Sequence, residues 1–214
     1  MSFPDSTHPE TTPDSSGAPV NLAVLVSGRG SNLRALIESC GAGALKGLAR
    51  IALVVSSRPE IEALEVADSA GIDTFVYQKN IDVEELLSRL ERSEVDLLAL
   101  AGYLKLIEKQ IVETYRGRIL NIHPALLPKF GGKGMYGINV FRAVIEAGET
   151  ETGVTVHLVD EKYDSGAVLI QEKFEVKSDD TPESLQTRTQ EIEHRVYPDA
   201  IAQYITRKQS QLNK

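Results

Sequence analysis

The sequence predicts an α/β protein built on a mostly parallel β-sheet. Segments 20–26 (VNLAVLV) and 95–101 (VDLLALA) are short and almost continuously apolar, which is typical of strands buried on both faces. Stretches of helical length separate such segments, and strands that alternate with helices favour parallel pairing through right-handed crossovers. Segments 153–159 and 168–176 instead alternate apolar and polar residues, which indicates a more exposed, antiparallel pair. We therefore expect a Rossmann-like sheet flanked by helices, with an antiparallel strand pair near the C-terminus.

Several of the expected elements begin or end at residues that have a physical reason to be there. Gly71 is typical of the end of a helix. Pro124 lacks the N–H that a central strand donates, so the strand before it should end at His123. Thr181 and Pro182 are typical of the N-cap and first position of a last helix. In chain order, the other strands are expected at 20–26, 51–55, 74–77 and 95–101, and the helices at 33–40, 59–70, 83–92, 107–115, 140–147 and from 182 to about 205.

The composition is that of a globular protein with an acidic balance. The net charge of −8 argues against a broad surface for a phosphate backbone, so nucleic acid is not an expected partner. The single cysteine, Cys40, excludes an internal disulfide and fits a reducing cytosol, and no apolar run reaches the length of a membrane span. We expect a cytoplasmic protein that binds small molecules, with neither nucleic acid nor membrane as a partner.

The N-terminus differs from the rest of the chain. Residues 1–19 hold four of the nine prolines and no lysine or arginine, so they resemble neither a signal peptide nor a folded segment. We expect a disordered leader at 1–19, a single domain at 20–207 and a short tail at 208–214.

The segment 118–128 (RILNIHPALLP) has the pattern of a strand that ends in polar chemistry. Side chains on a strand alternate between faces, so Asn121 and His123 share one face while Ile122 points to the other. An amide can donate to a developing oxyanion, and an imidazole can carry a proton near neutral pH. A buried Asn and His that merely satisfy loop backbone groups would give the same pattern, and an isolated N-x-H favours that interpretation.

The loop at 27–32 (SGRGSN) lies between the first strand and the first helix. Glycines let backbone N–H groups approach an anion, and a helix N-terminus favours negative charge. Leu33 stands where a dinucleotide-binding loop has its third glycine, and the G-K-[ST] ending of a P-loop is missing. A mononucleotide-like or sugar-phosphate site is favoured over a dinucleotide site, although glycines that only turn the chain give the same pattern.

The sequence offers weaker signals for a catalytic acid, a metal site and a catalytic nucleophile. A carboxylate from the segment 160–166 (DEKYDSG) could favour a charged His123, but the residues alone favour a local cap in a turn. None of the four histidines has the spacing of a metal site, and His157 on its alternating strand reads as structural. There is no G-x-S-x-G nucleophile elbow, so direct transfer between two bound substrates is more plausible than covalent catalysis.

Taken together, five segments resemble the folate-dependent formyltransferases. They are VLVSGRGSNL (24–33), LLALAGYLKLI (97–107), RILNIHPALLPKF (118–130), TGVTVHLVDEKYDSGAVLIQ (152–171) and QEIEHRVYP (190–198). The N-I-H-P-x-L-L-P segment with the later D-x-G is specific to this superfamily. The S-G-x-G-S-N loop points to its glycinamide ribonucleotide branch. The resemblance implies the formyltransferase fold and transfer of the formyl group of 10-formyltetrahydrofolate, the co-substrate, to the amine of glycinamide ribonucleotide in purine (IMP) synthesis, without a metal.

The resemblance also implies a role for particular residues. The catalytic residues would be Asn121, His123 and Asp164. The ribonucleotide would be bound by Arg29, Gly30, Ser31, Asn32 and Glu193. The folate would pack against Leu104, Lys105, Leu106 and Ile107 and contact Asn121, under a loop at 160–164. We expect a monomer or a homodimer.

The chain departs from the family pattern in one loop. Where many members have a P-G loop and a helix with two histidines, this chain has GGKGMYG (131–137), then Asn139 and Phe141. Three alternatives remain: a formyltetrahydrofolate hydrolase, a methionyl-tRNA formyltransferase and a non-catalytic phosphosugar-binding domain. The first usually has an N-terminal regulatory domain, the second needs a C-terminal domain and a basic surface, and the third has no need for the full catalytic set.

Overall fold

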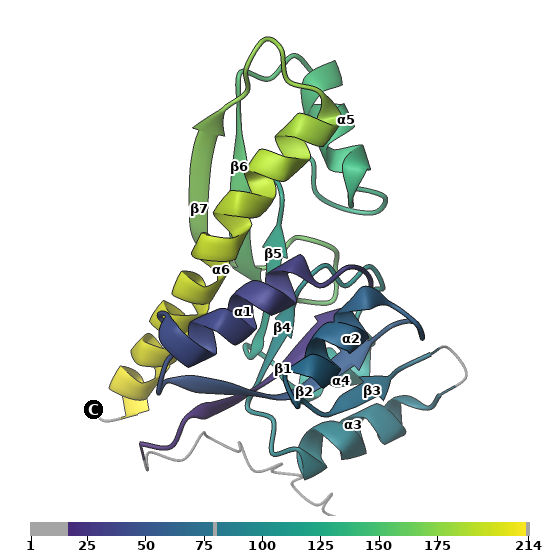
Figure 1. The fold of residues 1–214 in the computed structure, drawn as a ribbon, viewed down its shortest axis with the longest axis vertical. Helices are drawn as coiled ribbons and strands as arrows, with labels where there is room; N and C mark the ends of the chain where they lie inside the picture. Colours follow the sequence, from purple (N-terminus) through teal and green to yellow (C-terminus); the bar gives the residue numbers. More distant parts are fainter. Residues whose placement is uncertain (1–16, 79–80, 213–214) are drawn as a thin grey trace, which may run out of the picture.

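The computed structural model describes residues 17–78 and 81–212 and contains one seven-stranded sheet (Figure 1). The strand order is β3-β2-β1-β4-β5-β6-β7. The first five strands are mutually parallel, and β6 pairs antiparallel with both β5 and β7. The bounds are β1 (Val20–Val26), β2 (Ala49–Ser56), β3 (Thr74–Val76), β4 (Leu97–Leu100), β5 (Ile119–His123), β6 (Glu151–Leu158) and β7 (Val168–Glu175). The predicted fold class is confirmed, while most of the leader expected at 1–19 lies outside the described residues.

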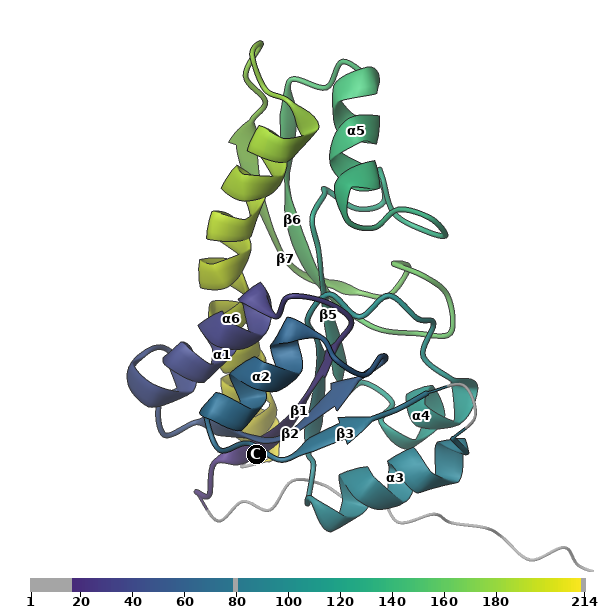
Figure 2. The ribbon, with the colours of Figure 1, turned by 45° about the vertical axis from the view of Figure 1, so that its right-hand side comes forward.

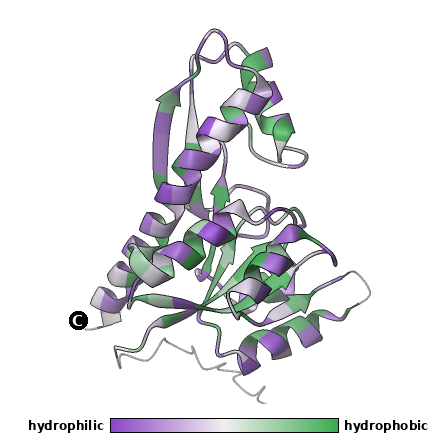
Figure 3. Ribbon diagram, in the orientation of Figure 1, coloured by the Kyte–Doolittle hydropathy of each residue, from purple (hydrophilic) through white to green (hydrophobic). Residues whose placement is uncertain are grey.

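Six helices accompany the sheet in the part of the chain that is described: α1 (Ser31–Ala42), α2 (Glu62–Ser69), α3 (Val83–Arg92), α4 (Lys109–Thr114), α5 (Ile138–Glu146) and α6 (Pro182–Leu212). The apolar sides of α1, α2 and α6 form one core with one face of the sheet, and those of α3 and α4 form a second core with the other face (Figure 2). The strands between these layers are predominantly apolar, as Figure 3 shows. Burial of β1 along its whole length follows from helices on both sides.

Two helix boundaries differ from the predicted ones by more than two residues. The helix expected from residue 59 begins at Glu62, because Glu60 has a φ of 52°, which a helical residue does not adopt. The last helix continues to Leu212, beyond the predicted end near residue 205. Its predicted start is confirmed, since Thr181 Oγ1 accepts from the Ser184 N–H at 3.2 Å.

The antiparallel strand pair is confirmed, but its two strands differ in exposure. β7 is the edge strand and is half exposed, as predicted. β6 is buried over most of its length, and the prediction of a more exposed strand was wrong there. The reason is that β6 lies between β5 and β7 and is covered by α6, which the local alternation of residues cannot reveal.

Helix α6 is the longest of the described elements. It packs beside α5 near its N-terminus and beside α1 further along (Figure 1). Its N-terminal turns pack Leu185 against α5 in a small third core. Further along, the buried Tyr197 hydroxyl lies 3.1 Å from the Leu100 carbonyl oxygen and 3.0 Å from that of Leu120, so it donates toward both. This contact fixes α6 against the last residue of β4 and against the residue of β5 that precedes Asn121, close to the predicted site residues.

Candidate active site

Strand β5 carries two of the predicted catalytic side chains. His123 is only 4% exposed, and its Nε2–H donates to the Phe130 carbonyl oxygen at 2.7 Å. Asn121, two residues earlier, is half buried. Pro124 ends the strand as expected, so the amide and the imidazole both lie at the carboxyl end of β5. Open α/β sheets bind their ligands at this end of the strands.

The third predicted residue, Asp164, reaches this pair from the loop between β6 and β7. Its Oδ2 lies 3.7 Å from His123 Nδ1, and its Oδ1 accepts from Asn121 Nδ2 at 3.4 Å. The Gly132 N–H also donates to Oδ2 at 2.8 Å, which holds the carboxylate from the side of the glycine-rich loop. The structure thus brings Asn121, His123 and Asp164 together. The 3.7 Å separation from His123 leaves room for tightening when a substrate binds.

The structure adds a fourth polar side chain to this cluster, His157. Antiparallel pairing of β5 with β6 sets His157 opposite Asn121. Its Nδ1–H donates to the Leu158 carbonyl oxygen at 2.7 Å, and its Nε2 lies 3.0 Å from Asn121 Nδ2. The same Nε2 lies 3.6 Å from Asp164 Oδ1. The reading of His157 as a structural residue missed this placement, because the signal was the strand register rather than any motif.

Burial and the neighbouring charges shift the pKa values of His123 and Asp164 in opposite directions. Burial lowers the pKa of His123 below its usual value, although Asp164 and the Phe130 carbonyl oppose the shift. Burial would raise the pKa of Asp164, but His157, His123 and the Gly132 N–H together lower it below its usual value. The two shifts favour an ionised Asp164 and disfavour the charged form of His123. A closer approach of Asp164 to Nδ1 would favour the imidazolium.

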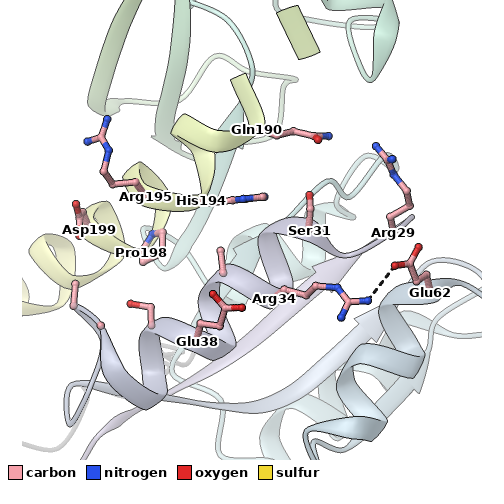
Figure 4. A pocket seen from close by; sticks show the side chains of 14 residues that line it. Arg29, Ser31, Arg34, Glu38, Glu62, Gln190, His194, Arg195, Pro198 and Asp199 are labelled. Atoms are coloured by element: carbon pink, nitrogen blue, oxygen red, sulfur yellow. Dashed lines mark hydrogen bonds and ion pairs between the residues drawn. The ribbon is translucent and has the colours of Figure 1, made fainter. Parts of the chain in front are cut away.

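The glycine loop lies at the start of α1. Gly30 has a φ of 80°, and a Cβ there would come within 2.8 Å of the Ala63 Cβ, so the loop requires glycine at this position. Gly30 is also the N-cap of α1 and makes no side-chain capping bond, so it leaves the first helical N–H groups to a ligand or water. Arg29 and Ser31 border a cavity of about 600 Å³, with Gln190 of α6 across from them (Figure 4). The Asn121 cluster does not line this cavity.

Glu193 of α6 lies behind the same loop. It is 7% exposed, and its Oε2 accepts from Asn32 Nδ2 at 3.3 Å. Burial raises the pKa of Glu193 to about 7, although the Asn32 amide opposes the shift. The Asn32 Oδ1 is buried without a hydrogen-bond partner. At the expected ribonucleotide site, these two side chains thus offer a buried amide oxygen without a hydrogen-bond partner and a buried carboxyl group.

The expected folate segment follows β4. Leu104 and Leu106 are 44% and 46% exposed and offer apolar surface, whereas the Ile107 side chain belongs to the second core and is not available to a ligand. Lys105 Nζ donates to the Tyr77 carbonyl oxygen at 3.3 Å. Two of the four predicted side chains are therefore placed to pack against a flat ring.

The described residues contain neither a cluster of metal-binding side chains nor a membrane-spanning helix. No group of three or more His, Cys, Asp or Glu side chains there could hold a metal ion. Within the same residues, no helix is both long and apolar enough to cross a bilayer.

A model of the formyl transferase family matches residues 20–201. The chain belongs to the formyl transferase family. Among its relatives, the chloroplastic phosphoribosylglycinamide formyltransferase of Arabidopsis thaliana is 43% identical over 187 residues, covering 84% of this chain and 63% of the relative. The phosphoribosylglycinamide formyltransferase of Haemophilus influenzae is 37% identical, covering 83% of each chain.

The fold of this formyl transferase also matches solved structures. That of glycinamide ribonucleotide transformylase 1 from Symbiobacterium toebii gives a TM-score of 0.80 at 35% identity, covering 88% of each chain. The chain thus spans less than two thirds of the length of the plant relative and most of the length of the two bacterial ones.

Proposed function

We propose that this formyl transferase moves the formyl group of 10-formyltetrahydrofolate to the amine of glycinamide ribonucleotide, in purine (IMP) biosynthesis. The observation that carries the proposal is the cluster of Asn121, His123 and Asp164 at the carboxyl end of β5. The names of the relatives support the choice of substrates. The Gly30 loop and Glu193 supply donors and acceptors that suit a phosphorylated sugar.

The reaction forms a bond between the amine nitrogen and the formyl carbon, and it breaks the bond between that carbon and N10. The amine nitrogen attacks the formyl carbon, and negative charge develops on the formyl oxygen. Asn121 Nδ2–H, which now reaches Asp164 over a long 3.4 Å contact, donates to that oxygen instead, and the positive charge of a protonated His123 stabilises it. The C–N10 bond then breaks, and a proton lost by the amine replaces the formyl group on N10. The products are formylglycinamide ribonucleotide and tetrahydrofolate.

Asp164 has two tasks in this scheme. Its lowered pKa keeps it ionised, so it can stabilise the imidazolium that His123 forms when its Nδ1 takes up the proton lost by the amine. A water bound beside the carboxylate and the imidazole can carry this proton to N10. His157 holds the Asn121 amide in place through its Nε2.

The proposal extends to the setting of the enzyme. We infer small-molecule substrates only, with no metal, nucleic acid or membrane, in a cytoplasmic monomer or homodimer. The acidic net charge of −8 supports the exclusion of nucleic acid. The single cysteine supports a reducing compartment.

A folate absorbance assay tests the proposed reaction. The purified full chain is mixed with 10-formyltetrahydrofolate, with and without glycinamide ribonucleotide, alongside His123→Ala. Turnover that requires the ribonucleotide and is lost in the variant is the expected result. Folate turnover without the ribonucleotide would identify a hydrolase instead. Binding of both ligands with no turnover would identify a non-catalytic binding domain.

A further inference from the structure

One buried hydroxyl lies between the two expected substrate sites and has no role in the scheme above. It belongs to Ser27, the residue that follows β1, and is 2% exposed. Strand β1 lies between β2 and β4, so the residues after those strands flank Ser27. Ser57, after β2, places its Oγ 2.6 Å from the Ser27 Oγ. The Leu104 N–H, after β4, donates to the same oxygen at 3.0 Å.

The surrounding bonds hold this hydroxyl in one position. The Ser57 N–H donates to the Val26 carbonyl oxygen at 3.0 Å, and the Arg58 guanidinium donates to the Ser27 carbonyl oxygen. Because the Leu104 N–H can only donate, the Ser27 oxygen must be the acceptor of that bond. The Ser27 and Ser57 hydroxyls share one hydrogen bond in which either can be the donor, so both have a partner in this buried junction.

The two segments that meet at Ser27 are the ones expected to hold the two substrates. The loop that includes Gly30 and Asn32 begins at the next residue, and the apolar segment that includes Leu106 begins at Leu104. A shift of one segment is therefore transmitted to the other through a single oxygen atom. Transfer between two bound substrates depends on their relative placement, and a displacement of about 1 Å can reduce a rate roughly 100-fold.

We propose that Ser27 is a positioning residue that couples the ribonucleotide and folate sites, an inference that rests on the proposed function. The hydroxyl fixes the distance between the two segments, so binding of one substrate orders the segment that binds the other. Such coupling is reciprocal: the ribonucleotide changes the affinity for folate by the same factor as folate changes the affinity for the ribonucleotide.

The test compares Ser27→Ala with Ser57→Ala in the full-length chain. Ser57 is a matched control because it is equally buried and touches Ser27, but it does not bond Leu104. Calorimetry measures the affinity for tetrahydrofolate with and without saturating glycinamide ribonucleotide, a pair that cannot react. We expect a change of about fivefold or more in the wild type and in Ser57→Ala, and no change in Ser27→Ala. Turnover should fall roughly 10- to 100-fold in Ser27→Ala only.

The outcomes separate this proposal from the proposed reaction. Coupling that persists in Ser27→Ala, or that is missing from the wild type, overturns the role of Ser27 even if formyl transfer is observed. If the wild type shows coupling but no transferase activity, and Ser27→Ala loses the coupling, the role of Ser27 is supported and the proposed reaction is overturned. Thermal unfolding identifies the purely structural case, in which the coupling ratio stays intact and activity falls only with the folded fraction.

Discussion

Replacing Glu193 by glutamine is expected to stabilise the protein at alkaline pH and to weaken its binding of glycinamide ribonucleotide. The carboxyl is buried, and burial raises its pKa from the ordinary 4.5 to about 7. An acid with a raised pKa ionises first in the unfolded chain, so the folded state loses stability as the pH rises from 4.5 to 7. The neutral glutamine has nearly the same shape and avoids this loss.

The magnitude follows from the pKa. Each step of one in pKa corresponds to about 1.4 kcal/mol, so ionising Glu193 in the folded state costs about 3 kcal/mol above pH 7. Between pH 5 and pH 8, the stability advantage of Glu193→Gln should grow by about 2 to 3 kcal/mol. For a chain of this size, that corresponds to roughly 5 to 10 °C in the unfolding temperature.

Thermal unfolding followed by circular dichroism at pH 5 and pH 8 measures this effect. Glu191→Gln is the matched control, because it removes the same charge from an exposed position of α6. The reasoning fails if the two pH values give the same difference between Glu193→Gln and the wild type, since the carboxyl would then ionise without a penalty. In the assay, the KM for the ribonucleotide should rise about tenfold in Glu193→Gln, because a charge-assisted hydrogen bond is lost.

Three further predictions follow from the site and the sheet. His123→Ala and Asp164→Ala should each lower kcat roughly 100- to 1,000-fold while leaving the unfolding temperature little changed, and a variant that loses only stability would contradict their catalytic role. His157→Gln should lower kcat roughly 10- to 100-fold with little change in either KM, because the Asn121 amide loses its partner; stopped-flow turnover checks this. Gly153→Ala should destabilise the protein by more than about 3 kcal/mol in urea unfolding, because its Cβ would lie 2.0 Å from the Glu172 carbonyl oxygen; unchanged stability would show that β6 and β7 can separate.

Local patterns were sufficient for much of the fold. The apolar run of β1 reflects burial on both faces, and the proline after His123 ends β5 by removing a donor. The same reasoning placed Asn121 and His123 on one strand face and the glycine loop before α1. Each of these features depends on residues within a few positions of one another, which a sequence displays directly.

The assembly of the site depends on contacts that are distant in the sequence. Asp164 lies 43 residues beyond Asn121, and the family resemblance, not its local turn, marked it as a site residue. The approach of His157 depends on the antiparallel register of β5 and β6, and a slip of one residue would turn its side chain to the other face.

The sequence by itself determined the order of the elements, the parallel sheet and the residue types available for the chemistry. The tertiary structure decided which of those residues meet, how deeply they are buried and, through burial, their protonation. Glu193 shows the difference: its place on a helix is readable from the chain, but its pKa is raised to about 7 only because the fold buries its carboxyl group. Helix and strand formation are governed by neighbouring residues, whereas desolvation and hydrogen bonding at a site are set by whatever the fold places around it.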